Sequence, residues 1–238
     1  MYSFTCKSRN ESFKPSYSMI GQCLSNKNKN ATVSKSKNFS HLNKALNDLV
    51  STAQNVFIKK RCIHDNFIYE QRVIQLLHKK RKSALFIKLD ISKDFDSINW
   101  SFLLEVLGKL GFNTKWKDWI TTLFGTATSR VLINGQPTGM MRHGRGLRQG
   151  DPLSPMLFIL AIDPLQRIIQ VAVDKGILSP VLPKAATTLR CSLYADDAAV
   201  FAAPTSLDIE HLHRILIFLE NARASESTCP KQKSIQSD

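Results

Sequence analysis

Two adjacent carboxylates, Asp196 and Asp197, interrupt the apolar stretch SLYADDAAVF at residues 192–201. Like charges a few ångströms apart repel strongly in a poorly hydrated site unless a cation neutralises them. Divalent cations that prefer oxygen ligands commonly fill this role in proteins. The alternative is a polar hairpin turn, because Asp is frequent in turns. This stretch by itself leaves both interpretations open.

A third carboxylate, Asp90, stands near the end of the apolar run ALFIKLDI at residues 84–91. A strand end and a neighbouring hairpin turn can face each other across a sheet, and the three carboxylates would then converge. That arrangement suits two Mg²⁺ ions, with Mn²⁺ as a substitute, bridged by a substrate phosphate. One ion would activate an attacking hydroxyl and the other would stabilise a departing pyrophosphate. The alternative is that Asp90 caps a structural element and the other two shape a turn.

Between these sites lies the segment HGRGLRQGDPLSP at residues 143–155. Its glycines do not follow the G-x-G-x-x-G spacing, and no P-loop lysine follows them. A donor-rich loop that leads into a helix N-terminus fits better, because Arg145, Arg148 and Gln149 would then reach phosphates or bases with help from the helix dipole. A plain surface loop is the alternative.

The elements that must position these residues follow from the spacing of the apolar side chains. We expect a strand over 84–91, helices over 99–111 and 113–125, a strand and turn over 129–144, an apolar helix over 151–176 that breaks at Pro164, a hairpin over 188–203 and an amphipathic helix over 206–222. This order predicts an α+β domain, with an antiparallel sheet and helices on one face. Upstream, residues 57–83 favour a helix with Ile68, Val73, Leu76 and Leu77 turned inward.

The charge of the chain is high and uneven. The formal net charge is +14 over 238 residues, and residues 1–82 hold 16 Lys and Arg against 4 Asp and Glu. A balance of this kind indicates a polyanionic partner, either a nucleic acid or an acidic membrane surface. The cluster Lys79, Lys80, Arg81 and Lys82 would contact phosphates without reading sequence, although a solvated helix end explains it equally well.

Residues 1–40 are rich in Ser, Asn and Lys and are expected to be a disordered basic arm. The five cysteines are scattered without C-x-x-C spacing, which disfavours a zinc site or a disulfide framework and favours a reducing compartment. Residues 1–10 lack the apolar core of a secretory signal, and no run is expected to approach the length of a membrane span. An intracellular location, in the nucleus or the cytoplasm, is therefore expected.

Five segments resemble, in order and spacing, the reverse transcriptases of non-LTR (LINE-like) retrotransposons, most closely those of plants. They are FIKKRCIHDN, FIKLDISKDFDSINW, SRVLING, RHGRGLRQGDPLSPMLFILAIDPLQ and LYADDAAVF. The resemblance covers roughly residues 45–222. It implies a right-hand polymerase palm over 84–222, a partial fingers segment over 41–83 and a divergent tail over 223–238. The implied activity is RNA-directed DNA synthesis by two-metal nucleotidyl transfer, with an RNA template, a DNA primer and deoxynucleoside triphosphates as partners and no membrane.

The resemblance also implies roles for individual residues. Asp90, Asp196 and Asp197 would be the catalytic carboxylates, and the metal site would comprise these three and Ile91. Phe95 would exclude a ribose 2′-hydroxyl by its bulk. Nucleotide binding would further involve Arg148, Gln149, Gly150 and Tyr194, with Tyr194 near the primer end. Arg61 would join the Lys79–Lys82 cluster in contacting nucleic acid.

The sequence departs from the family pattern at several places. Asp94 stands where a small residue, often Ala, is usual, and a carboxylate there is expected to weaken binding of the triphosphate. Lys60 replaces a glycine in the fingers turn. The upstream fingers segment with its triphosphate-binding arginine and the downstream thumb are not recognised, so the chain resembles a truncated domain. The alternative function is a catalytically inactive relic that retains nucleic-acid binding. A palm-type cyclase is a third reading, which the RQGDP loop and the basic arm argue against.

Overall fold

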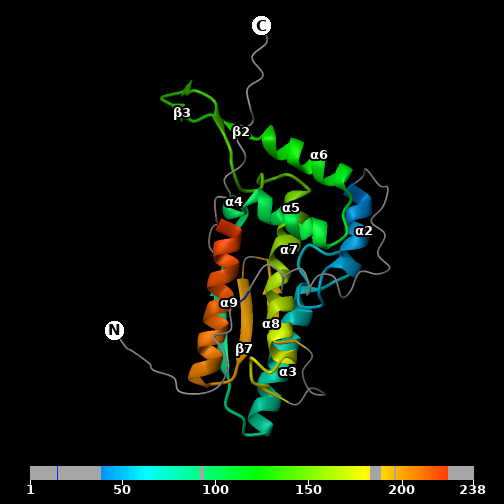
Figure 1. The fold of residues 1–238 in the computed structure, drawn as a ribbon, viewed down its shortest axis with the longest axis vertical. Helices are drawn as coiled ribbons and strands as arrows, with labels where there is room; N and C mark the ends of the chain where they lie inside the picture. The colour runs from blue at the N-terminus through cyan, green and yellow to red at the C-terminus, as the bar shows by residue number, and fades with distance from the viewer. Residues whose placement is uncertain (1–14, 16–38, 92–93, 183–188, 196, 225–238) are drawn as a thin grey trace.

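The computed structural model describes residues 15, 39–91, 94–182, 189–195 and 197–224. Most of the expected basic arm 1–40, the expected tail beyond Ala224, and Asp196 therefore lie outside the described residues. The described elements, in chain order and with the labels of Figure 1, are α2 (Phe39–Leu49), α3 (Ile63–Lys79), β1 (Leu85–Asp90), α4 (Asp94–Ser97), α5 (Trp100–Lys109), α6 (Thr114–Gly125), β2 (Thr128–Ser129), β3 (Leu132–Ile133), β4 (Gln136–Pro137), β5 (Met141–Arg142), α7 (Ser154–Ile162), α8 (Pro164–Asp174), β6 (Cys191–Tyr194), β7 (Asp197–Ala202) and α9 (Ser206–Ala224).

A three-stranded antiparallel sheet in the order β1-β7-β6 forms the centre of the fold. The register pairs Leu85 with Ala202 at one end of β1 and Asp90 with Asp197 at the other. On the neighbouring strand, Tyr194 pairs with Asp197. Because side chains alternate along each strand, every second residue of β1 and β7 belongs to the same face of the sheet.

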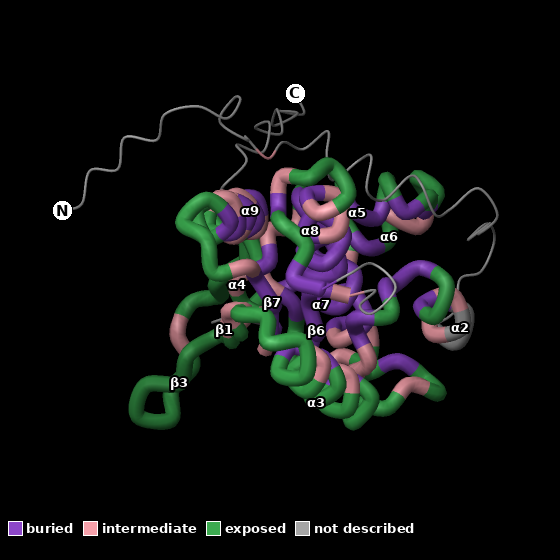
Figure 2. The backbone as a smooth tube through the Cα atoms, turned by 90° about the horizontal axis from the view of Figure 1, so that it is seen from below, coloured by how far each residue is buried: buried purple, intermediate pink, exposed green. Residues whose placement is uncertain are grey.

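One face of the sheet packs on the helical layer that holds the core. Leu89, Ala198, Val200 and Leu193 belong to the large cluster that also contains the buried side chains of α7, α8 and α9. Figure 2 shows these strands beside the buried turns of α7 and α8, with α9 next to them. The expected α+β architecture with an antiparallel sheet is confirmed. Helices α7, α8 and α9 cover this face, while α3 covers part of the other.

The expected break in the long apolar helix is also confirmed, since α7 ends at Ile162 and α8 begins at Pro164. The carboxylate of Asp163 is only 2% exposed at this break. It accepts hydrogen bonds from the backbone N–H of Ser51 and from the Nε of Arg167, while Arg167 also donates to the carbonyl of Leu49. These contacts fasten the loop after α2 to the core helices.

By length and composition, the segment Ser154–Asp174 could cross a membrane, with a mean hydropathy of 1.6 over its most apolar window. The expectation that no such run exists is therefore wrong. However, 83% of that window is buried inside the protein. A core helix pair of a globular domain passes the same test, because burial in a core and burial in lipid select the same side chains.

The opposite face of the sheet is covered only in part. Phe201 of β7 packs with Val73 and Leu77 of α3 in a second, smaller cluster. Toward β1 this face opens to solvent, and Phe86 and Lys88 are exposed. Of the inward face expected for α3, Val73 and Leu77 are buried and Leu76 is partly buried, but Ile68 is 44% exposed, so that part of the expectation is wrong.

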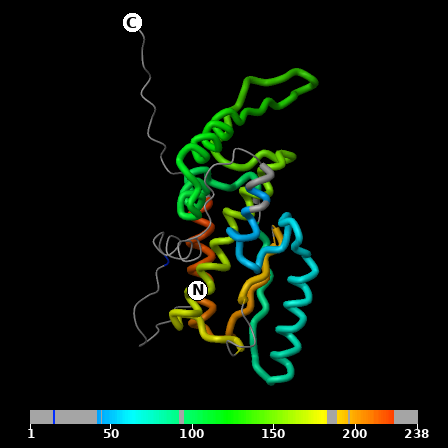
Figure 3. The backbone as a smooth tube through the Cα atoms, turned by 90° about the vertical axis from the view of Figure 1, so that its right-hand side faces the viewer, coloured from blue at the N-terminus to red at the C-terminus, as the bar shows by residue number. Residues whose placement is uncertain are grey.

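Residues 128–142 form a thin hairpin, here called the arm, that projects from the domain (Figures 1 and 3). β2 pairs with β5 at its base and β3 pairs with β4 at its tip. Asn134 and Gly135 both have positive φ at the turn, as a two-residue type I′ hairpin requires. The Asn-Gly pair is the sequence signal for this turn, and the expected strand and turn over 129–144 are confirmed.

Candidate active site

Two of the three candidate carboxylates meet at one edge of the sheet. Asp90, the last residue of β1, is the direct cross-strand partner of Asp197, the first residue of β7. Directly opposite residues in an antiparallel pair present their side chains on the same face about 5 Å apart. The two carboxylates therefore share the face that carries Lys88 and Tyr194. Asp196 lies outside the described residues, and its expected metal role stays a prediction.

A cation already stands at this carboxylate pair. The Nζ of Lys88 lies 3.0 Å from Oδ2 of Asp197, with 68% and 38% of the two side chains exposed. Lys88 precedes Asp90 by two residues on β1, so it belongs to the same face of the sheet. The ammonium group shows that this position attracts positive charge. Among the described residues no cluster of three metal-ligating side chains occurs, but the chemistry of Asp90 and Asp197 suits a hard divalent cation.

Strand β6 enters the site through Tyr194, whose hydroxyl donates a 2.8 Å hydrogen bond to Oε1 of Glu70 on α3. Burial, and secondarily this bond to the carboxylate, raise the pKa of the Tyr194 phenol well above its usual value. The next residue, Ala195, has a φ of +60°, which is costly for a residue with a Cβ. The sharp turn into β7 is thus made by a residue in the left-handed region.

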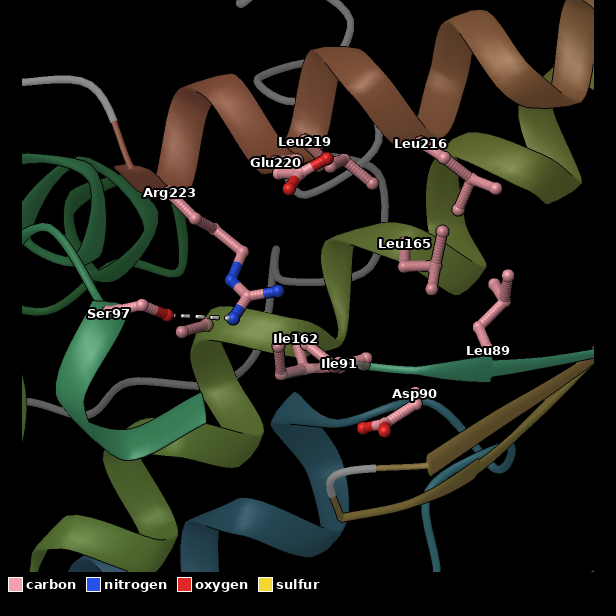
Figure 4. A pocket seen from close by; sticks show the side chains of 11 residues that line it. Leu89, Asp90, Ile91, Ser97, Ile162, Leu165, Leu216, Leu219, Glu220 and Arg223 are labelled. Atoms are coloured by element: carbon pink, nitrogen blue, oxygen red, sulfur yellow. Dashed lines mark hydrogen bonds between the residues drawn. The ribbon is translucent and has the colours of Figure 1, made fainter. Parts of the chain in front are cut away.

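Figure 4 shows that Asp90 and its neighbour Leu89 point to opposite sides of β1. Leu89, Asp90 and Ile91 line a cavity of about 430 Å³, together with residues of α4, α7, α8 and α9. Arg223, near the end of α9, crosses one end of this cavity and donates to Ser97 of α4. The expected role of Ile91 at the metal stays a prediction.

The loop before α7 is joined to α4 by backbone contacts. Gly146 has a φ of +86°, and a Cβ at this position would lie 2.9 Å from the carbonyl oxygen of Asp96. The N–H of Leu147 donates to the carbonyl of Phe95, and the indole of Trp100 donates to the carbonyl of Gly146. Only glycine fits such an approach. The loop that carries Arg148 is therefore held beside the residue expected to act as the sugar gate.

Comparisons with known proteins agree with this geometry. The family described as reverse transcriptase (RNA-dependent DNA polymerase) matches residues 12–236. The chain belongs to this family.

Three relatives show where the similarity lies. An uncharacterised 149 kDa protein of transposon TX1 from Xenopus laevis is 28% identical over 71% of this chain and 12% of its own length. A Pol polyprotein of the R2 retrotransposable element from Popillia japonica is 31% identical over 42% of this chain and 16% of its own. The R2DM polyprotein of Drosophila melanogaster is 28% identical over 58% and 12%. The chain thus spans a small part of these relatives, and its fold is a polymerase palm.

The structure places the remaining residues expected in a reverse transcriptase site. Phe95 is partly buried and stacks on Phe158 of α7, with 4.8 Å between ring centroids. Arg148, Gln149 and Gly150 are exposed on the loop before α7, and Gly150 has a φ of +84°. An Arg148 nitrogen lies 3.4 Å from Oγ1 of Thr126. The roles expected for these residues in nucleotide binding stay predictions.

Arg61 has a structural task in this reverse transcriptase domain. Its guanidinium group donates to four backbone carbonyls at and after the end of α2, those of Asn47, Val50, Ser51 and Gln54. Burial lowers the pKa of Arg61 from its usual value. The expected contact of Arg61 with nucleic acid stays a prediction. By contrast, Lys79, Lys80, Arg81 and Lys82 are exposed at the far end of α3, away from the carboxylates.

Three residues of the site escaped sequence reasoning. Lys88 could have been predicted from the sequence, because residues two apart on a strand lie on the same face, and Lys88 precedes Asp90 by two. Asn66 and Glu70 were hidden, since a search for apolar side chains on α3 passes over polar ones. Their four-residue spacing on a helix was the available signal, because residues so spaced share one side.

Proposed function

We propose that this chain catalyses RNA-directed DNA synthesis through the carboxylates of Asp90 and Asp197, with Asp196 as a third ligand. The observation that carries the proposal is the register of the sheet, which makes Asp90 and Asp197 direct partners. Polymerase chemistry asks for placed carboxylates and a cation-rich approach for phosphates. Two Mg²⁺ ions, when bound, supply the Lewis acidity that activates the attacking hydroxyl and stabilises the leaving group.

In the proposed reaction, the 3′-hydroxyl oxygen of a DNA primer forms a bond to the α-phosphorus of a deoxynucleoside triphosphate. The bond from that phosphorus to the bridging oxygen breaks, pyrophosphate leaves, and the hydroxyl proton passes to solvent. Asp90 and Asp197 hold the reacting groups on one face of the sheet. Tyr194 packs beside Asp197 on the same face, where the primer end is expected. Phe95, on α4, limits the room for a ribose 2′-hydroxyl.

The arm, together with the loop that follows it as far as Gly150, is the proposed contact surface for the RNA template. Residues 126–150 contain four arginines and one histidine but no Asp or Glu. Arg130, Arg142 and Arg145 are exposed, and so are apolar side chains near the tip, with Leu132 at 68% exposure. Figures 2 and 3 place the arm on the same side of the sheet as α3, which is the face of the carboxylates. Its positive charge complements a phosphate backbone.

Primer extension on an RNA template tests the proposal. Purified chain, Mg²⁺ and deoxynucleotides should give products that Asp197→Asn reduces by about 10²-fold or more, since a lost catalytic group costs several kcal/mol. Asp118→Asn removes an exposed carboxylate on α6 and is the matched control. Asp94→Ala tests the expected penalty at α4 and should increase the rate.

The outcomes separate the proposed enzyme from its alternative. Extension that Asp197→Asn removes and Asp118→Asn leaves intact supports the polymerase. RNA binding without extension in the parent chain and in Asp94→Ala indicates the inactive relic. Extension that survives Asp197→Asn points to a contaminating polymerase and overturns the assignment of the site.

A further inference from the structure

We propose that Glu70, on α3, is a positioning residue that fixes the turn carrying Asp197 by holding the hydroxyl of Tyr194. This inference rests on the proposed function and deepens it, because it names a residue outside the carboxylates that sets their geometry. Strand β6 lies at one edge of the three-stranded sheet. An edge strand leaves one row of backbone groups without partners in its sheet.

Helix α3 and the loop before it complete that edge of β6. The N–H of Leu193 donates to the carbonyl of Ala53 at 2.9 Å, and Gln54 forms a parallel bridge to Leu193. Asn66, 3% exposed, donates from Nδ2 to the carbonyls of Ala53 and Leu193. Its Oδ1 accepts from Asn55. Both polar atoms of the Asn66 side chain therefore form hydrogen bonds, one of them to Leu193, the residue before Tyr194.

Glu70 lies one helical turn beyond Asn66 and continues the contact to the next residue of β6. Its side chain is 9% exposed, and Oε1 accepts the 2.8 Å hydrogen bond from Tyr194. A buried carboxylate that accepts a hydrogen bond from a phenol is more strongly coupled to it than two neutral groups would be. The ring of Tyr194 is therefore fixed at both ends, by the strand and by Glu70.

The hydrogen bond between Tyr194 and Glu70 lies next to the turn that leads to Asp197. Tyr194 is the direct partner of Asp197, and the turn between them includes Ala195 at φ +60°. A left-handed alanine persists only where surrounding contacts hold it, and such residues cluster at functional sites. The hydrogen bonds that Asn66 and Glu70 of α3 form with Leu193 and Tyr194, here called the clamp, supply those contacts on the β6 side. Because Asp197 begins β7, a displaced turn displaces the carboxylate from Asp90.

The test compares Mn²⁺ affinity, measured by titration calorimetry, in Glu70→Leu, Glu70→Gln, Tyr194→Phe and the double variant Glu70→Leu with Tyr194→Phe. Groups that orient metal ligands typically change affinity by about 10- to 100-fold when removed. We expect Glu70→Leu and Tyr194→Phe each to weaken Mn²⁺ binding to that extent. The double variant should be no weaker than the single ones, because both remove the same hydrogen bond. Glu70→Gln keeps an acceptor oxygen and should retain most of the affinity.

Tyr69→Phe is the matched control. Tyr69 neighbours Glu70 on α3, and its hydroxyl donates to the carbonyl of Leu189, ahead of β6. This variant loosens the same helix at the other end of the strand and should lower stability without changing Mn²⁺ affinity. Equal losses of affinity in Tyr69→Phe and Tyr194→Phe would reduce Glu70 to a general packing role and overturn the proposal. Unchanged affinity in folded Glu70→Leu would overturn it too.

A second measurement keeps this inference separate from the proposed function. Amide hydrogen exchange at Leu193 and Asp197 reports the turn directly, with no metal present. The clamp predicts faster exchange at these amides in Glu70→Leu than in Glu70→Gln. A parent chain that binds no Mn²⁺, or binds it undiminished in Asp197→Asn, contradicts the metal site, and the exchange rates then decide whether the clamp exists.

Discussion

The ammonium group of Lys88 lies 3.0 Å from the carboxylate of Asp197, at the place where the proposed reaction requires a divalent cation. The two side chains reach each other because Lys88 and Asp90 share a face of β1 and Asp90 pairs with Asp197. The pair is largely exposed, so its contribution to stability is small, about 0–1 kcal/mol. Its importance lies in the competition between an ammonium group and a metal for the same oxygen.

Lys88→Met should therefore strengthen binding of Mn²⁺ to the metal-free chain. The variant removes both the competing ammonium group and its repulsion of the incoming ion, and we expect the affinity to rise about fivefold, equivalent to ~1 kcal/mol for a screened pair. Calorimetric titration with Mn²⁺ measures it. Lys109→Met, which removes an exposed lysine in the last turn of α5, is the control. Weaker binding in Lys88→Met would mean that Lys88 orders Asp197 rather than competing with the metal.

The arginines of the arm should set the salt dependence of RNA binding. Each phosphate contact contributes about one unit to the slope of log affinity against log salt concentration, slightly less for single strands. Arg130→Gln and Arg142→Gln should each lower that slope by about 0.7 on a single-stranded RNA. Fluorescence anisotropy across a salt series measures it. Leu132→Ser, at the tip of the arm, removes no charge and should leave the slope unchanged. If the parent chain self-associates and Leu132→Ser does not, the tip contacts another protein chain instead of RNA.

Arg61→Lys separates a structural role from nucleic-acid binding. The substitution keeps the charge but loses the fork of donors that serves four carbonyls. Three of these carbonyls are partly buried, and leaving them without donors should cost about 1–3 kcal/mol of unfolding free energy. Urea denaturation measures the cost, with Arg72→Lys on the exposed side of α3 as the control. A preserved stability with weaker RNA binding would assign Arg61 to phosphate contact after all.

The buried ion pair at the break between α7 and α8 should be a major support of the fold. Arg167→Met leaves the Asp163 carboxylate buried beside the backbone N–H of Ser51 with its cation gone. Breaking one side of such a pair costs about 3–5 kcal/mol. Denaturant unfolding should show that loss, and the exposed pair Arg214 and Glu210 on α9 provides a control in Arg214→Met. Similar losses of unfolding free energy in Arg167→Met and Arg214→Met would contradict the expectation that the buried ion pair matters more than the exposed one.

Tyr69 should make the protein less stable in alkali. Burial raises the pKa of its phenol above the ordinary value of 10.0. The unfolded phenol loses its proton near pH 10, whereas the folded one keeps it, so unfolding becomes easier as pH rises beyond 10. The stabilisation is complete below that pH and is lost as pH approaches the folded pKa. Chemical denaturation at pH 9 and pH 11 should show a smaller pH effect in Tyr69→Phe than in the parent chain.

The edge of the sheet that brings Asp90 and Asp197 together was largely predictable from the sequence. The run of strand-type residues at 84–91 predicted β1 up to Asp90, and the apolar residues on both sides of the Asp196–Asp197 pair indicated a hairpin. Those two elements suffice to bring the carboxylates together once they pair. Pro164 likewise predicted the break between α7 and α8, because proline lacks the N–H that a continuous helix needs.

The support of the site was not predictable in the same way. Helix α3 turns Asn66 and Glu70 toward β6, whereas apolar periodicity placed Ile68 on the inner side. Hydrogen bonds between segments distant in sequence leave no periodic signal. The approach of Gly146 to Asp96 is similar, since a glycine in a loop gives no sign of which backbone it touches.

The pairing of β1 with β7 also has a consequence for folding during synthesis on the ribosome. The helices from α4 to α8 lie between β1 and β7 in the sequence. After the ribosome has made β1, it therefore needs on the order of ten seconds to reach β7, and β1 stays unpaired during that time. During that interval the segment Leu85–Asp90 offers an unpaired, apolar edge to other chains. Lys88 carries a charge in the middle of that edge. Charged side chains on unpaired strands disfavour pairing with other chains, so we expect Lys88, which contacts Asp197 in the folded protein, also to limit aggregation of the nascent strand.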